Sequence, residues 1–61
     1  MTITFNGYKV TANKQTMNYL SILASEAYHN YKNEGYEGLA NEADKFSQAI
    51  FDELSSQGYY N

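Results

Sequence analysis

Residues 2–11 read TITFNGYKVT, and this stretch decides the fold. Two short runs rich in β-branched and aromatic residues flank the pair Asn6-Gly7. This pair is the strongest short-range signal for a two-residue type I′ turn, because both central residues of that turn need positive φ. The stretch therefore predicts a β-hairpin over residues 2–11, with the strand pairing fixed by the turn.

The predicted turn divides this hairpin into an apolar face and a polar face. Phe5 is expected opposite Tyr8, and every second residue of a strand shares a face. The apolar face carries Ile3, Phe5, Tyr8 and Val10, whereas the polar face carries Thr2, Thr4, Lys9 and Thr11. A lone hairpin is marginally stable in water, so we expect the rest of the chain to cover the apolar face.

Residues 14–33 have the periodicity of an amphipathic helix. Apolar residues recur three and four positions apart, which places them on one stripe. The stripe consists of Met17, Leu20, Leu23, Ala24, Ala27, Tyr28 and Tyr31. Asn13 is the expected N-cap, and Gly35 suits the left-handed position just beyond the helix end. We therefore expect the chain to turn at Gly35.

Residues 37–57 predict a second helix. Its apolar stripe consists of Leu39, Ala43, Phe46, Ile50 and Leu54. Glu37 falls in or near the first turn, where a negative charge complements the helix dipole. Gly58 is expected to close the helix, which leaves residues 58–61 as a tail.

The order of these elements predicts a mostly helical α+β fold, ββαα, in one small domain of residues 1–61. Two helices joined by a short glycine-containing turn pack antiparallel as an αα-hairpin, with their stripes facing each other. The β-hairpin then covers one open side of the pair. An alternative is one long bent helix through residues 35–38, since each glycine there costs about 1 kcal/mol without forbidding a helix. That form would dimerise by exchange.

The composition of the 61-residue chain limits how it can be stabilised. A chain of this length buries only about 60% of the surface of its unfolded form, so its core is marginal. Cysteine is absent, which excludes disulfides and thiolate zinc sites and leaves oligomerisation or a partner as the supplement. No apolar run reaches the roughly 20 residues of a membrane span, and the first residues lack the features of a signal peptide. We therefore expect a cytoplasmic protein without membrane contact.

The charge balance argues against nucleic acid as a direct partner. Four lysines face seven acidic residues, and the net charge is −3. Neutralising phosphates needs a basic face, which four scattered lysines do not form. The acidic surface is expected either to serve solubility or to meet a basic partner protein.

Few residues are available for chemistry, and their spacing fits no catalytic or metal site. His29 is the one imidazole, and no second histidine or cluster of carboxylates lies at ligand spacing from it. The serines fall on predicted helices without the Gly-x-Ser-x-Gly elbow of a nucleophile, and the glycines form neither GxGxxG nor a P-loop. We therefore expect a non-enzymatic protein with no catalytic, cofactor or metal site, and we interpret His29 as an exposed surface residue.

Three carboxylates share the outer surface of the second predicted helix. At 3.6 residues per turn, Glu37, Asp44 and Asp52 fall within about 80° of one another, and we call these three residues the acidic strip. Glu42 and Glu53 flank the other edge of the apolar stripe. Rows of carboxylates can take the place of phosphates in a groove rich in lysine and arginine. The acidic strip is therefore a candidate partner-binding surface, and the alternative is a solvated helix face.

Several apolar residues lie outside or at the edge of the two stripes and are further candidates for partner binding. They are Tyr19, Ile22, Phe51, Tyr59 and Tyr60. Tyr19 and Ile22 lie roughly opposite the first stripe, and a second apolar face implies contact with another chain. Phe51 is covered by the hairpin, by the tail or by a partner. The aromatic pair of the tail either folds back on the core, which we expect, or anchors a partner.

In size, acidity and lack of catalytic groups, the chain is similar to accessory proteins of phages and mobile elements, some of which inhibit host enzymes. That resemblance implies a protein that acts by occupying a surface of a larger molecule. Seven tyrosines supply contact area for such binding. We predict a small acidic interaction module that blocks a larger host protein and forms a homodimer through its helices. The alternative is a structural or assembly subunit that acts through homo-oligomerisation.

Overall fold

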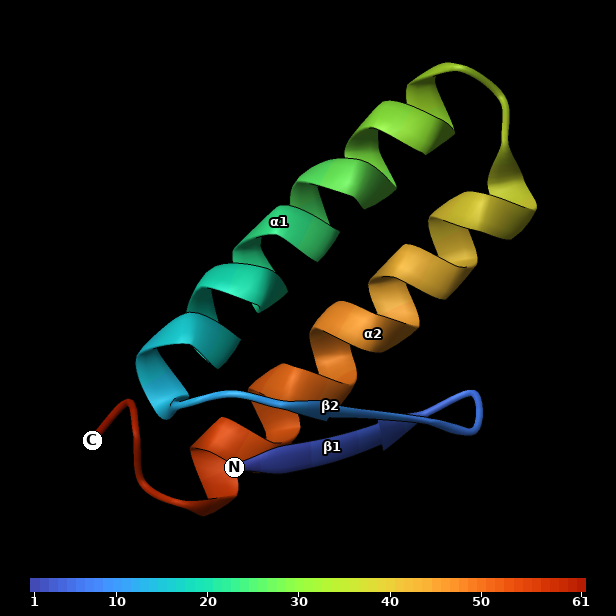
Figure 1. Cartoon of the computed structure of the whole chain (residues 1–61). Coiled ribbons are helices and arrows are strands. Elements are labelled where there is room, and N and C mark those ends of the chain that lie inside the picture. Colours follow the sequence, from blue (N-terminus) through green and yellow to red (C-terminus); the bar gives the residue numbers. More distant parts are fainter.

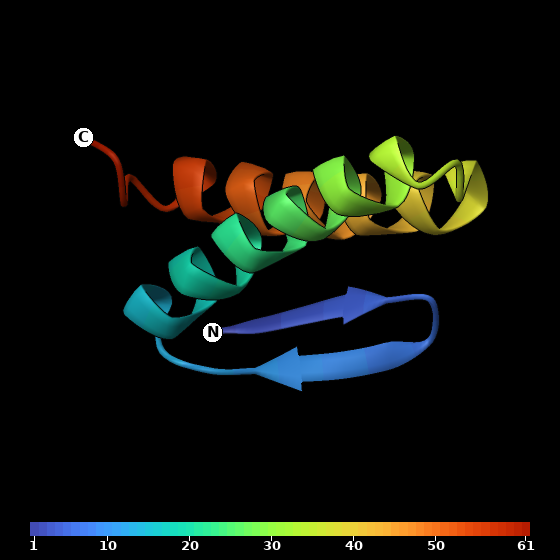
Figure 2. The same ribbon diagram turned by 90° about the horizontal axis from the view of Figure 1, so that it is seen from above.

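A β-hairpin lies against one side of a pair of antiparallel helices, as two perpendicular views show (Figure 1, Figure 2). The computed structural model describes residues 1–61. The elements are the strands β1 (Thr2–Phe5) and β2 (Tyr8–Thr11), followed by the helices α1 (Lys14–Asn33) and α2 (Glu37–Ser56). This order confirms the predicted ββαα fold. Neither helix combines the length and the apolar composition that crossing a membrane requires.

The hairpin turn has the backbone geometry that the sequence predicts. Asn6 and Gly7 have φ values of 51° and 82°, so both central residues lie in the positive-φ region that a type I′ turn needs. The strands pair antiparallel, with Phe5 opposite Tyr8 as expected. The space next to the Cα atom of Gly7 is open, so glycine is required there for its conformation and not for its size.

The hairpin is attached to α2 by one apolar and one polar contact near its turn. Strand β1 is the strand that packs against this helix. The ring centroids of Phe5 and Phe46 lie 5.2 Å apart. Beside them, Asn6 Nδ2 donates a hydrogen bond of 2.6 Å to the carboxylate of Glu42. The turn therefore fixes both the strand pairing and the position of the hairpin along α2.

Capping residues set the limits of both helices. At the start of α1, Asn13 Oδ1 accepts a hydrogen bond of 2.8 Å from the backbone N–H of Thr16. Gly35, with a φ of 86°, turns the chain between the helices, so the single bent helix considered as an alternative does not form. Helix α2 ends at Ser56, one residue before the predicted end, and Gly58 follows with a φ of 74°.

The largest buried side chains form one cluster at the end of the helix pair where the hairpin packs. Ile3 of β1, Met17 of α1, and Ile50 and Leu54 of α2 make up this cluster. Partly buried residues from β2, both helices, the tail and the residues flanking the hairpin pack around it. Burying one such side chain contributes about 1.5–3 kcal/mol, so this end of the molecule supplies much of the stability of the fold.

Small side chains line the contact between the two helices. Ser21, Ala24 and Ala40 are buried, and Ser47 Oγ donates a hydrogen bond of 2.9 Å to the carbonyl oxygen of Ser21. Ser21 lies four residues after Met17 and therefore on the same side of α1 as the predicted stripe. The sequence pattern followed only apolar residues and so missed both serines as parts of the helix contact.

Three residues that were predicted to be covered are instead exposed. Tyr8 of β2, Leu23 of α1 and Leu39 of α2 are 76%, 41% and 52% exposed. The cause is the position of the hairpin, whose contacts with α2 reach Phe46 and Glu42 but not the next turn toward Leu39. Only β1 approaches a helix closely, which leaves Leu23 and Tyr8 without a covering element.

Candidate functional site

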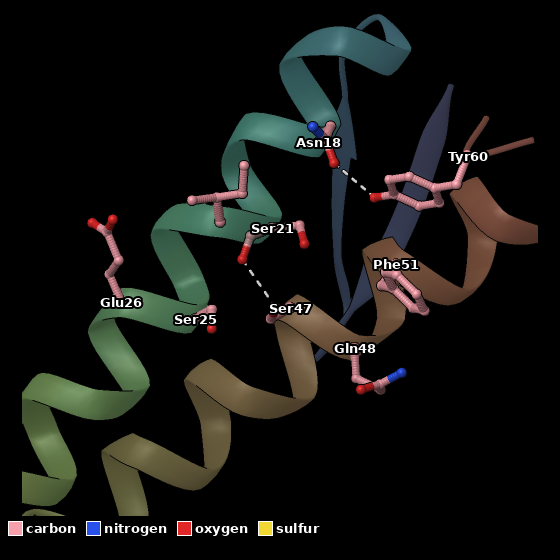
Figure 3. Close-up of a pocket in the computed structure, with 9 residues that line it drawn as sticks. Asn18, Ser21, Ser25, Glu26, Ser47, Gln48, Phe51 and Tyr60 are labelled. Atoms are coloured by element: carbon pink, nitrogen blue, oxygen red, sulfur yellow. Dashed lines mark hydrogen bonds between the residues drawn. The ribbon is translucent and has the colours of Figure 1, made fainter.

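The hairpin covers one side of the helix pair and leaves the other side, which we call the outer face, uncovered (Figure 2). On the outer face, α1, α2 and the tail surround an open groove of about 480 Å³. The groove is lined by the serines Ser21, Ser25 and Ser47 and by the larger apolar residues Ile22, Phe51 and Tyr60. Figure 3 looks into this outer groove, with the hairpin behind the helices. The outer groove is the candidate site of this protein.

The base of the outer groove consists of small hydroxyl side chains where the helices meet. Ser21 is buried, and the hydrogen bond from Ser47 to its carbonyl oxygen crosses the base (Figure 3). No buried side-chain nitrogen or oxygen of the protein lacks a hydrogen-bond partner. Because its buried polar groups are paired and its side chains are short, the base leaves room for a bound group to approach both helices.

The rim of the outer groove is apolar and comes from three segments of the chain. Ile22 of α1 is 48% exposed and Phe51 of α2 is 46% exposed. The ring of Tyr60 stacks on that of Phe51, with centroids 5.1 Å apart and planes inclined by 28°. The Tyr60 hydroxyl donates a hydrogen bond of 2.7 Å to Asn18 Oδ1 of α1 (Figure 3). One aromatic side chain of the tail thus joins the two helices at the end of the groove.

The tail folds back on the helices, as the sequence predicts. The backbone N–H of Tyr59 donates a hydrogen bond of 3.0 Å to the carbonyl oxygen of Leu54. The Tyr59 side chain packs against the core cluster, and its ring meets that of Tyr60 edge to face at 5.2 Å. Of the two tail tyrosines proposed for partner binding, Tyr59 therefore supports the core, whereas Tyr60 borders the outer groove.

A second groove, of about 410 Å³, adjoins the first across α1. Asn18 and Ile22 line both grooves, and Tyr19 belongs to the second one only. Tyr19 is 61% exposed. The structure thus brings Tyr19 and Ile22 onto the same surface as Phe51 and Tyr60, although α1 and the tail are far apart in the sequence.

The acidic strip is exposed along α2, and two of its members lie near a lysine of α1. The Lys32 ammonium donates a hydrogen bond of 3.0 Å to the hydroxyl of Tyr28. That hydrogen bond is the main cause that raises the pKa of Lys32 above its ordinary value, and the charges of Glu37 and Asp44 raise the pKa further. The acidic strip is therefore partly offset by a cation at the end of the helix pair where α1 turns into α2.

The third member of the acidic strip lies beside the outer groove. Asp52 accepts a hydrogen bond of 2.9 Å from Nε2 of Gln48, which belongs to the groove lining. Glu26 also belongs to that lining on α1, with its carboxylate directed away from α2 (Figure 3). The remaining two carboxylates of α2 make local contacts, Glu42 with the hairpin turn and Glu53 with Gln57. Negative charge therefore borders the outer groove on both helices.

His29 lies on the surface of α1, beside Tyr28. The His29 imidazole is exposed, and its ring lies 5.1 Å from that of Tyr28 in an edge-on contact. No group of three or more histidine, aspartate or glutamate side chains is placed to hold a metal ion. His29 is also not among the residues that line the outer groove.

Sequence reasoning found the apolar rim of the site but missed its polar lining. Asn18, Ser25 and Gln48 were not singled out as site residues. A signal was present, because Asn18 and Ser25 lie seven residues apart and share one edge of α1 beside the apolar stripe. Polar residues on such an edge can be recognised as site residues only when the neighbouring helix and the tail are known to border them.

Comparison with known proteins yields no match to any family model, to any curated protein or to any solved structure.

Proposed function

We propose that the protein is a small non-enzymatic interaction module that binds a larger protein through its outer face and blocks it. The observation that carries this proposal is the gathering of Ile22, Phe51 and Tyr60 around one open groove, on the side of the helices that has no covering layer. Aromatic and aliphatic anchors in a groove contribute most of the binding energy at protein interfaces. A chain without a reaction centre acts by occupying the surface of its target.

The charge near the groove supports a basic partner protein. Glu26 and Asp52 border the groove from the two helices, and the whole chain has a net charge of −3. A target whose apolar contact surface is bordered by lysine or arginine gains specificity and association rate from such charges. The same charges disfavour nucleic acid as the partner. We therefore propose a cytoplasmic host protein as the target, as for the inhibitory phage proteins that the chain resembles in composition.

A capture experiment from cell lysate tests this function. Ile22→Glu places a charge on the groove rim and is expected to abolish capture of the target. The control Leu39→Ser changes an equally exposed apolar residue away from the groove and is expected to leave capture intact. Capture is also expected to weaken between about 50 mM and about 300 mM salt. If capture survives Ile22→Glu in a folded variant, or if Leu39→Ser abolishes it, the outer face is not the binding face.

A second candidate function is homo-oligomeric assembly. Four exposed large side chains lie outside both grooves, namely Tyr8, Leu23, Tyr36 and Leu39. A second copy of the chain is the simplest cover for such residues. Light scattering at high micromolar concentration measures the oligomeric state directly. Loss of a dimer in Leu23→Glu supports assembly through these four residues. Loss of a dimer in Tyr19→Glu supports the homodimer through the helices. A monomeric wild-type protein contradicts both.

A further inference from the structure

We infer that the element of the partner that the outer groove takes is a single cationic amphipathic helix, lying along the groove between α1 and α2. This inference rests on the proposed function and specifies the chemistry of the partner. Three features of the groove lead to it: its walls, its charges and the position of the tail.

The walls of the groove favour a helix over an extended peptide. An extended peptide gains most of its affinity by adding a strand to the free edge of a sheet. The walls of the outer groove are helices, whose backbone groups are already paired within each helix. The base between them consists of Ser21, Ser25 and Ser47, which are short enough to let a third helix approach to ordinary packing distance, about 8–10 Å between axes. An apolar ridge of that helix would pack between Ile22 and Phe51.

The carboxylates in and near the groove favour a cationic helix. Asp52 lies beside the groove through its hydrogen bond with Gln48, and Asp44 lies eight residues before it on α2, a spacing of about 12 Å along the helix axis. Glu26 belongs to the groove lining on α1, with its carboxylate on the side away from α2 (Figure 3). Lysine or arginine side chains about two turns apart on the bound helix would therefore meet carboxylates, while an acidic helix would be repelled.

The same charges disfavour a second copy of this chain as the occupant. In a symmetric dimer the same surface of both copies is in contact. Pairing of two outer faces would therefore bring Glu26 and Asp52 of one copy close to the carboxylates of the other, and like charges in an interface oppose association. A positively charged helix from a different protein has no such penalty.

The tail fixes one end of the bound helix. Tyr60 stacks on Phe51 and is hydrogen-bonded to Asn18, so it closes the groove at the end near the tail. From this end the groove extends along α1 past Ile22 to Glu26. The aromatic pair of Phe51 and Tyr60 supplies a rigid surface against which one large apolar residue of the partner packs.

A displayed peptide library tests the inference while the target is still unidentified. The probe is a library of helix-favouring peptides of about 18 residues with acidic, neutral and basic members in equal number, selected on the immobilised protein. We expect enrichment of peptides with apolar residues at helical spacing flanked by lysine or arginine. Their affinity should fall at least about tenfold in Ile22→Glu and severalfold in the double variant Asp44→Asn and Asp52→Asn. Leu39→Ser, the matched control, should bind them as the wild type does.

Each other outcome of the selection contradicts the inference. Enrichment of acidic or neutral peptides, or of none, excludes a cationic helix as the occupant. A concentration-dependent dimer that Ile22→Glu dissolves identifies a second copy instead. Circular dichroism of every variant verifies the fold. The inference and the proposed function fail separately. If Ile22→Glu loses target capture but no basic helical peptides are enriched, only the inference of a helical partner is refuted. If capture survives Ile22→Glu, the proposed binding face itself is refuted.

Discussion

The covered side and the outer side of the helix pair each carry an aromatic pair, and only one pair is part of a layered core. On the covered side, Phe5 and Phe46 meet at 5.2 Å, and both are partly buried. On the outer side, Phe51 and Tyr60 stack at 5.1 Å, yet both remain exposed. The residue types and distances are alike, so the covering hairpin makes the difference. A change on the covered side should therefore cost stability, and a change on the outer side should cost binding.

The largest expected effect is on the covered side. Leu54→Ala removes a fully buried side chain and should lower the free energy of unfolding by about 2–5 kcal/mol. The matched change on the outer side, Ile22→Ala, should lower it by less than about 1 kcal/mol, because that side chain is already in contact with water. Urea titration followed by circular dichroism measures both values. Equal losses in the two variants would contradict the difference between the sides.

Reversing the acidic strip should affect binding more than stability. Changing Glu37, Asp44 and Asp52 to lysine should weaken target binding by about 2–5 kcal/mol through repulsion of a basic partner. Each exposed charge contributes less than about 1 kcal/mol to stability, so the variant should stay folded. The control reverses Glu34 and Glu53, which are also exposed but are not part of the strip. Normal binding by the triple variant in a calorimetric titration would show that the acidic strip is only solvated surface.

The turn of the covering layer should be sensitive to its backbone conformation. Gly7→Val places a β-branched residue at positive φ and should cost about 1–3 kcal/mol. The control Gly38→Ala lies within α2, where the added methyl group meets no atom, and should stabilise the protein by about 0.5–1 kcal/mol. Thermal melts compare the two. A Gly7→Val protein that melts within about one degree of the wild type would exclude this turn as a determinant of the fold.

A smaller effect is expected from the hydroxyl of the tail. Tyr60→Phe keeps the ring on Phe51 but removes the hydrogen bond to Asn18, and it should lower stability by about 0.5–1.5 kcal/mol at most because water can replace the lost partner. Tyr60→Ala removes the stacked ring as well and should lower stability further. Chemical shifts of the Asn18 side chain in NMR spectra report the loss of the contact. Equal melting temperatures of the two variants would mean that the ring itself stabilises nothing.

The smallest effect concerns Lys32 and depends on pH. The pKa of its ammonium is raised above 10.5, first by the hydrogen bond to Tyr28, so the folded state binds this proton more tightly than the unfolded state. The resulting stabilisation is fully present below the ordinary pKa and is lost as the pH rises through the raised value. Because the group is fully exposed, Lys32→Met should lower the melting temperature only slightly at neutral pH. A difference that grows with alkaline pH would contradict this sign.

The elements of the fold could be predicted because local signals determine them. Asn6-Gly7 specifies its turn and Gly35 separates the helices through their backbone conformations, and Asn13 caps α1 through its side chain. The lateral position of the hairpin could not be predicted, because helical periodicity shows which side of a helix is apolar but not how far along it a cover extends. For that reason Leu39 was expected in the core and is exposed.

The candidate site was predictable only in part. Tyr19, Ile22 and Phe51 were recognised as apolar residues off or at the edge of the helical stripes. The groove that joins them depends on the path of the tail, which brings Tyr60 from the end of the chain to Asn18 near the start of α1. Contacts between residues so far apart in sequence leave no periodic pattern along the chain.

The turn that fixes the hairpin also makes the covered side of the helix pair susceptible to chemical degradation. In an asparagine followed by glycine, the next backbone nitrogen readily attacks the carbonyl carbon of the side-chain amide and expels ammonia, because glycine has no side chain to shield it, and asparagine is among the thermolabile residues. Water then opens the resulting cyclic imide to aspartate or isoaspartate. Loss of the Asn6 amide leaves a carboxylate facing that of Glu42, where a donor now makes a contact of 2.6 Å. Repulsion would replace attraction at this point. Storage of the protein should therefore loosen the hairpin from α2 while the serines and aromatic rings of the opposite side stay chemically intact.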